Sequence, residues 1–146
     1  MGFLDRFRKK KVEKEVVEKA VEPEETMSDL ERICMGDKEV YKALRETMYL
    51  DPSNIQVTMQ DAEKNAKDFE IQGNKLRARM WYQTAGGLAI YEGNVKKVKE
   101  YFGKLAELSP NTEYPILKIP EKAVSKAQEY YQDQKQKRLM AEKTSE

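Results

Sequence analysis

Apolar side chains recur every three or four residues along most of this chain, which is the period of an α-helix. The first helix is expected to begin at Ser28, which has the capping-box spacing to Glu31, and to end near Gly36. Asp37 suits the N-cap of a second helix, which should end at the turn residues 51–54. The apolar stripe of this second helix consists of Val40, Tyr41, Leu44, Met48 and Tyr49.

Two further helices are predicted over residues 58–72 and 75–92. The first should lie on the surface, because it has one narrow apolar stripe. That stripe is Met59, Ala62, Ala66 and Phe69. The second is apolar around nearly its whole circumference and should be the most buried element. Its apolar residues are Leu76, Met80, Trp81, Tyr82, Ala85, Leu88, Ala89, Ile90 and Tyr91. Gly86 and Gly87 lie within this helix, although each glycine costs about 1 kcal/mol relative to Ala in an exposed helix. We therefore expect that they let a neighbouring helix approach closely, and the alternative is a kink.

A fifth helix should follow the turn at Gly93 and Asn94, form an antiparallel hairpin with the fourth and end at Pro110. Prolines predict an extended connector up to Ile119, and Pro120 suits the first turn of a last helix. The apolar side of the last helix is Ala123, Ala127 and either Tyr130 or Tyr131.

These elements predict an all-α fold with a flexible N-terminal tail. The fold is either a small irregular antiparallel helical bundle or a repeat-like array of five to six helices. Along the chain we expect a basic amphipathic segment over 1–12, an acidic linker over 13–27 and a helical domain over 28–132. Residues 133–146 are polar, and this helix end is expected to fray.

The predicted hairpin also carries a family resemblance. Its second helix follows a Gly-Asn turn, and an aromatic residue, a small residue and a leucine precede Pro110, while Gly86 supplies a small residue in the first helix. Residues 82–111 in this way resemble one degenerate tetratricopeptide repeat. Residues 50–54 look like the end of another repeat, but Pro52 lies 58 positions before Pro110, whereas a regular array repeats at about 34. The resemblance implies protein or peptide binding in a groove, without chemistry.

Composition narrows the function further. The chain has 146 residues, 39% of them hydrophobic, which suits a single domain with a modest core. The net charge of +1 gives no global positive field and argues against nucleic acid as the partner. The chain has no His, and Cys34 is its only Cys and is expected in the core. A single Cys cannot form a disulfide within the chain, so we expect a reducing, cytoplasmic setting. Because His is the commonest metal ligand and proton-transfer side chain, we expect neither a metal nor another cofactor.

The first residues combine aromatic rings with cations. Phe3, Leu4 and Phe7 share one face of a short helix, and the cations Arg6, Arg8, Lys9, Lys10 and Lys11 lie beside or after them. Ring insertion and attraction to anionic lipid are what an interfacial anchor needs, so this segment is a candidate for docking to a membrane surface or a partner, placing the protein at the inner face of the membrane. The alternative is a disordered, solubilising start.

A second candidate site is a peptide groove on the hairpin, formed by Tyr101, Lys97, Tyr82 and Arg79. The structural alternative places aromatic residues in the core, which we expect above all for Trp81 and Phe102. Together these features predict a non-enzymatic adaptor or scaffold that binds a protein or peptide. Two alternatives remain: a homo-oligomeric structural subunit that pairs through Tyr130 and Tyr131 of the last helix, and a small enzyme that uses carboxylate, Lys and Tyr chemistry.

Overall fold

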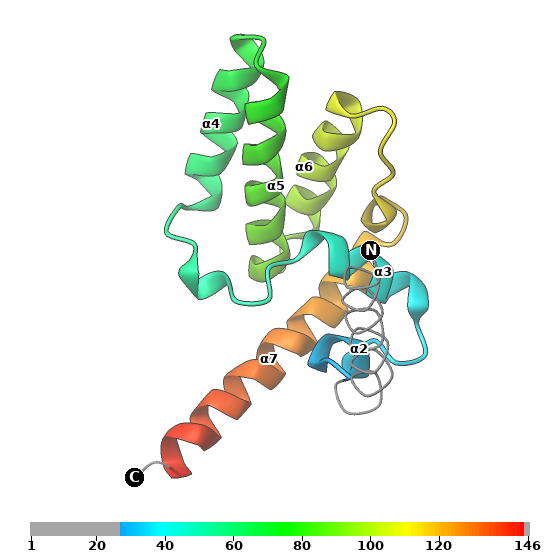
Figure 1. The fold of residues 1–146 in the computed structure, drawn as a ribbon, viewed down its shortest axis with the longest axis vertical. Helices are drawn as coiled ribbons and strands as arrows, with labels where there is room; N and C mark the ends of the chain where they lie inside the picture. The colour runs from blue at the N-terminus through cyan, green and yellow to red at the C-terminus, as the bar shows by residue number, and fades with distance from the viewer. Residues whose placement is uncertain (1–26, 145–146) are drawn as a thin grey trace, which may run out of the picture.

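The computed structural model describes residues 27–144, which form six α-helices and two short 3₁₀ turns (Figure 1). No strand occurs within this range, so the predicted all-α fold is confirmed as a small helical array. The helices are α2 (Asp29–Ile33), α3 (Lys38–Thr47), α4 (Met59–Ile71), α5 (Lys75–Glu92), α6 (Val95–Leu108) and α7 (Pro120–Thr144). The 3₁₀ turns are η1 (Pro52–Asn54) and η2 (Pro115–Leu117).

The helices begin where the sequence places capping residues. The Ser28 hydroxyl accepts the Glu31 N–H at 3.1 Å, and an Asp37 carboxylate oxygen accepts the Val40 N–H at the same distance. The side chains of Thr58, Asn74 and Asn94 cap α4, α5 and α6 in the same manner. Each cap satisfies a backbone N–H that a helix start leaves free, so these boundaries are fixed locally.

The array has two parts (Figure 1). Helices α4, α5 and α6 lie side by side and alternate in direction, with α5 between the other two. Helices α2, α3 and the first half of α7 pack below them. Gly93 has a left-handed backbone (φ 73°) that a side chain would strain, and it allows α5 to turn directly into α6.

The core lies where the two parts meet. Its largest fully buried side chains include Leu44 of α3, Ile90 of α5, Phe102 of α6 and Ile116 of η2. Cys34 is buried as predicted. Phe102 packs over Gly86, where a Cβ would lie 2.8 Å from its ring carbons, so the expected close approach is confirmed.

Helix α5 is less completely buried than predicted. All residues from 85 to 90 are buried, but Leu76 is 61% exposed, Met80 57% and Tyr91 46%. Helices α3 and α7 contact α5 near its second half, where Tyr49 meets Gly87 and Gln128 meets Ile90. No helix among residues 27–144 therefore covers the outward face of the first half of α5.

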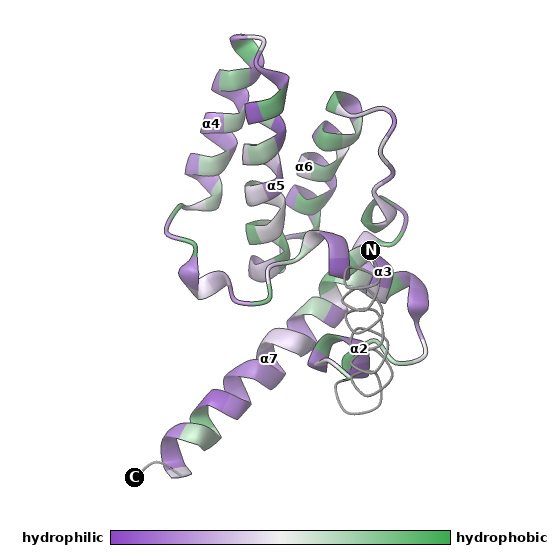
Figure 2. Ribbon diagram, viewed as in Figure 1, coloured by the Kyte–Doolittle hydropathy of each residue, from purple (hydrophilic) through white to green (hydrophobic). Residues whose placement is uncertain are grey.

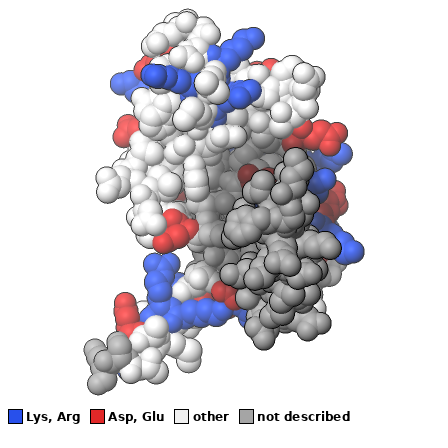
Figure 3. Space-filling model, in the orientation of Figure 1, with Lys and Arg blue, Asp and Glu red and all other residues white. Residues whose placement is uncertain are grey.

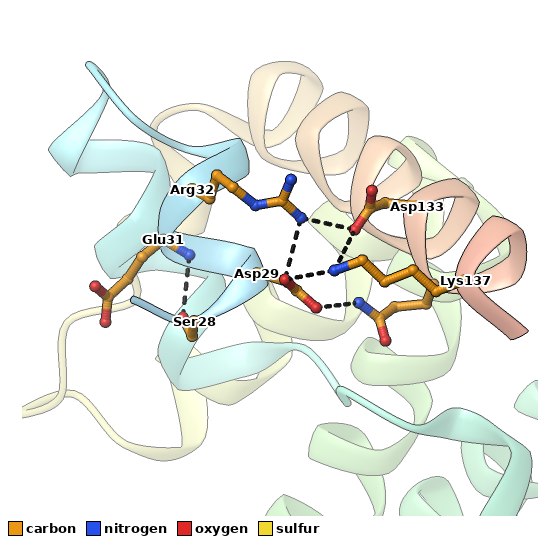
Figure 4. A network of polar contacts seen from close by, with 7 residues as sticks. Ser28, Asp29, Glu31, Arg32, Asp133 and Lys137 are labelled. Atoms are coloured by element: carbon orange, nitrogen blue, oxygen red, sulfur yellow. Dashed lines mark hydrogen bonds and ion pairs between the residues drawn. The ribbon is translucent and has the colours of Figure 1, made fainter. Parts of the chain in front are cut away.

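Helix α7 continues without interruption past Gln132. Asp29 of α2 accepts hydrogen bonds from Gln134 and Lys137, each at 2.7 Å, and Arg32 bridges Asp29 and Asp133 at 3.0 Å (Figure 4). Contacts with the helical domain thus reach beyond the predicted boundary at 132. Farther along, α7 is exposed and mostly hydrophilic (Figure 2), and fraying of this end stays a prediction.

Candidate functional site

Three of the four predicted groove residues lie together, but they do not form a groove. Tyr82 and Tyr101 are each only 1% exposed, with ring centroids 6.3 Å apart, and Lys97 lies over the Tyr101 ring. Arg79 lies elsewhere and donates a hydrogen bond to the Ser109 hydroxyl at 3.1 Å. The predicted peptide groove at these four residues is therefore corrected: its two tyrosine rings belong to the core because α4 covers them.

The buried tyrosine hydroxyls are bonded to two glutamates of α4. Tyr101 donates to Glu63 at 2.7 Å, and Tyr82 donates to Glu70. Lys97 and Lys104 of α6 add ion pairs to Glu63 and Glu70 at 2.9 and 3.7 Å. Because Glu63 and Glu70 are seven residues apart, as are Lys97 and Lys104, the same contact repeats after two helical turns. We call these six residues the tyrosine–carboxylate ladder.

The groups of the ladder resist a change of protonation near neutral pH. The hydrogen bond from Tyr101, with that from Lys97, lowers the pKa of Glu63 from 4.5 to about 2. Burial and a hydrogen bond to a glutamate raise the pKa of Tyr82 and of Tyr101. A group that transfers protons near neutral pH needs a pKa near 7. The ladder instead suits a fixed structural link from α4 to α5 and α6.

A more accessible surface lies on the other side of the seam between α4 and α5. An open hollow of about 800 Å³ separates the outer faces of these helices, and we call it the α4–α5 hollow. It is lined by Tyr49, Asn65, Phe69, Arg77, Met80, Trp81, Gln83 and Thr84. Trp81 and Phe69 are partly buried and Met80 is exposed, so the lining presents apolar surface to solvent.

The lining of this hollow is partly fixed in place. The Arg77 guanidinium lies 5.5 Å from the centroid of the Phe69 ring, within the range of a cation–π contact. The Tyr49 hydroxyl donates to the Thr84 hydroxyl at 3.4 Å. These contacts link α4 to α5 and α5 to the segment after α3.

A smaller hollow, of about 200 Å³, lies on the opposite side of the exposed face of α5. Its lining includes Leu76, Arg79, Met80, Gln83 and Tyr114, so both hollows share Met80 and Gln83. Leu76 and Met80 are one helical turn apart and form an exposed apolar strip between the hollows, which we call the α5 ridge.

Positive charge surrounds the α5 ridge. Within the described residues, Lys75, Arg77 and Arg79 form no ion pair, whereas Lys97 and Lys104 of α6 are each paired with glutamates. Figure 3 shows Lys and Arg side chains gathered at the end of the molecule where α4 turns into α5. The ridge thus combines apolar surface with unneutralised cations.

This surface was not predicted from the sequence, because Trp81 was expected in the core. The sequence of α5 nevertheless indicated an exposed apolar surface, because this helix has apolar residues on almost every side and its neighbours cover only some of them. Phe69 at the edge of the narrow stripe of α4 was a second signal, since its ring borders the same opening.

The predicted oligomer contact has a role within the chain. Tyr130 is buried and donates to the Leu50 carbonyl at 3.4 Å, and Tyr131 donates to the Tyr49 carbonyl at 2.6 Å. The two rings also pack edge to face, with centroids 5.5 Å apart. This pair therefore anchors α7 to the segment after α3.

The candidate docking residues Phe3, Leu4, Phe7 and the cations between 6 and 11 lie outside the described residues. Between residues 27 and 144, no cluster of Cys, Asp or Glu is arranged to hold a metal ion. No helix in the described part has both the length and the apolar character required to cross a bilayer.

Comparison of this chain with protein-family models, with curated proteins and with solved structures finds no match. The tetratricopeptide resemblance therefore has no support beyond the α5–α6 hairpin itself.

Proposed function

We propose that this protein is a non-enzymatic adaptor whose helical domain binds a segment of a partner protein along the α5 ridge. The observation that carries the proposal is the exposure of Met80 and the partial exposure of Trp81 beside a hollow of about 800 Å³. Exposed apolar surface gathered at a concave site is typical of interaction sites, and Trp is enriched among the residues that dominate binding energy.

The charges around the ridge favour an acidic ligand. Lys75, Arg77 and Arg79 have no carboxylate partner among the described residues, so an acidic segment would gain ion pairs without breaking existing ones. The two hollows on either side of Met80 could each accept an apolar side chain of that segment. The proposed ligand is therefore a short acidic segment with two apolar anchors.

A displayed library of short peptides tests this function, with the full-length protein as bait. Trp81 is the only tryptophan, so its emission reports binding at the ridge directly. Selected peptides should be acidic, should shift the Trp81 emission, and should bind roughly tenfold or more weakly to Met80→Glu and Arg77→Glu variants.

Leu139→Glu is the matched control, because it places the same charge on a half-exposed apolar residue of α7. Selected peptides should bind this variant as they bind the unchanged protein. Peptides that bind all three variants equally, or a library that yields no binder, would rule out the α5 ridge as the ligand site.

In the complete proposal, residues 1–12 place this adaptor at an anionic membrane surface. The argument is the pairing of Phe3, Leu4 and Phe7 with five nearby cations, since apolar insertion and attraction to lipid reinforce each other.

A further inference from the structure

A second groove runs along the exposed half of α7, away from the α5 ridge. It has a volume of about 510 Å³ and lies between the segment around η1, the end of α5 and α7. Leu50, Tyr91 and Leu139 line it and are each about half exposed. We call it the α7 groove.

The floor of the α7 groove is held in place by contacts among its own residues. The rings of Tyr91 and Tyr131 pack edge to face with centroids 4.9 Å apart. The side-chain amide of Gln128 donates to the carbonyls of Ile90 and Tyr91 at 2.8 and 3.1 Å. A ligand would therefore meet a preformed surface, and its binding would cost little conformational entropy in the protein.

The charged lining of the groove is mainly positive. Lys135 and Arg138 form no ion pair with any described residue, and among the described residues of the lining only Glu142 is a carboxylate. From residue 133 onward, α7 has four cations against two carboxylates. An acidic, amphipathic occupant would match both the apolar and the charged parts of this lining.

This chain supplies such a segment close to the groove. Residues 13–25 contain six Glu against two Lys, and Val16, Val17, Ala20 and Val21 fall on one side of a helix. The described chain begins at Met27, only two residues before Asp29. Asp29 is hydrogen-bonded at 2.7 Å to Gln134, which itself lines the groove.

We propose that residues 13–22 of the same chain dock in the α7 groove as a short amphipathic helix. Its valines would cover Leu50, Tyr91 and Leu139, while its glutamates face Lys135 and Arg138. A ten-residue helix is about 15 Å long, which is shorter than the roughly 21 Å of α7 between Gln128 and Glu142. The segment therefore fits the groove in length.

Residues 23–27 tether the segment to the domain, so a weak contact with the α7 groove is sufficient for docking. Residues 23–27 span at most about 17 Å when extended, which keeps the segment near the groove. A short tether gives an effective concentration in the millimolar range, so even a contact that would be negligible between separate molecules is populated. Docking would hold the basic residues 1–12 beside α7, which fixes where a membrane contact could form.

Paramagnetic relaxation in the full-length protein tests the docking. A nitroxide is attached to Lys19→Cys, which lies opposite the valines, in a Cys34→Ala background that leaves one thiol. The NMR signals of the backbone amides of Tyr91, Arg138 and Leu139 should lose most of their intensity. The amide signal of Leu76 on the α5 ridge should keep its full intensity.

Charge variants make the test specific. Lys135→Glu with Arg138→Glu should weaken docking roughly tenfold, and adding Glu18→Lys with Glu22→Lys should restore it. The matched control is Lys75→Glu with Arg77→Glu, the same charge change beside the α5 ridge, which should leave the broadening unchanged. Restoration by the charge swap also excludes misfolding as the cause of the loss.

Three results would overturn the proposal. The first is broadening centred on another helix, and the second is broadening that the charge variants do not change. The third is equal broadening in a mixture of nitroxide-labelled chains with separate isotope-labelled chains, which would place the segment on a second copy. None of them bears on the α5 ridge, because peptide binding there is measured by Trp81 emission and by different variants.

Discussion

The ring of Tyr49 packs against the backbone of Gly87, so that a methyl group at position 87 would overlap its ring carbons. One helix turn of α5 thus carries two bare backbone positions, each covered by a different ring, since Phe102 covers Gly86. Tyr49 also lines the α4–α5 hollow, which links the packing of α5 to the shape of the candidate site.

Alanine substitutions at three helical glycines should have three different effects on the free energy of unfolding. Gly86→Ala should destabilise by about 1–3 kcal/mol, because the fully buried Phe102 ring has little room to move. Gly87→Ala should cost less, since the half-buried Tyr49 ring can swing outward. Gly103→Ala should stabilise by up to about 1 kcal/mol, because a Cβ there meets no atom within 4 Å.

Urea denaturation of the three variants checks this order. Gly87→Ala should also alter the Trp81 emission, because Tyr49 and Trp81 border the same hollow. Equal effects at 86 and 103 would show that Phe102 does not press on Gly86.

The stability of the fold should fall in acid partly through Glu63. Its folded pKa of about 2 is below its ordinary value of 4.5, so the stabilisation is complete above about pH 5 and is lost as the pH falls toward 2. Glu63→Gln should lower the free energy of unfolding at pH 7 by on the order of 1–2 kcal/mol, a discounted value because the side chain is 20% exposed.

Denaturation at pH 7, 5 and 3 measures this difference between the unchanged protein and the variant, which should shrink below pH 4. Glu46→Gln is the control, since Glu46 is exposed and forms no ion pair with a described residue. A difference that stays constant with pH would mean that the hydrogen bond to Tyr101, rather than the charge, stabilises the fold.

The reactivity of Cys34 should report how firmly α2 is attached. Cys34 is the only cysteine, and burial both hides its thiol and raises its pKa. Asp29→Asn removes the carboxylate that Arg32 and Lys137 share in Figure 4, so α2 should open more often. Modification of Cys34 by a thiol reagent should become roughly three- to tenfold faster, the effect of weakening a few surface ion pairs.

Glu39→Gln is the matched control, because Glu39 is likewise an acidic residue in the first turn of a helix but has no such network. Salt at 0.5 M should reduce the difference in the rate of Cys34 modification between Asp29→Asn and the unchanged protein, because it screens the ion pairs of Asp29. If Asp29→Asn leaves the rate of Cys34 modification unchanged, the apolar contacts of Leu30 and Cys34 alone hold α2.

Membrane attachment should depend on the aromatic residues near the N-terminus. The full-length protein should co-sediment with vesicles of mixed phosphatidylserine and phosphatidylcholine, and not with phosphatidylcholine alone. Phe3→Ser with Phe7→Ser should abolish most of this binding, because the remaining cations give only electrostatic attraction. The control is Phe69→Ser, and equal sedimentation of all variants would refute an anchor at residues 1–12.

Local features of the fold could be predicted from the sequence because their causes are local. Ser28, Asp37 and Asn94 each cap a helix through a backbone N–H three residues away, and this spacing is visible without a structure. Gly93 ends α5 for the same kind of reason, since the left-handed turn requires its missing side chain.

The candidate sites could not be predicted in this way, because they depend on which helices are neighbours. Tyr101 was assigned to a groove, although its partner Glu63 lies 38 residues earlier on another helix. Trp81 was expected in the core, but it is only partly buried and borders the open α4–α5 hollow. Helical spacing tells which residues share a face, but not whether another element lies against it.

The tyrosine–carboxylate ladder has a consequence for the surface behind it. Helix α4 packs along α5 and makes no comparably extensive backbone contact with another described helix. Its Ala62 and Ala66 form the seam with α5, and Glu63 and Glu70 lie on one side of that seam while Asn65 and Phe69 lie on the other. Glu70 bonds to Tyr82 of α5 and Glu63 bonds to Tyr101 of α6 at the edge of the seam that faces away from Trp81. We therefore expect the loss of either hydrogen bond to change the opening beside Trp81, although neither glutamate lines it.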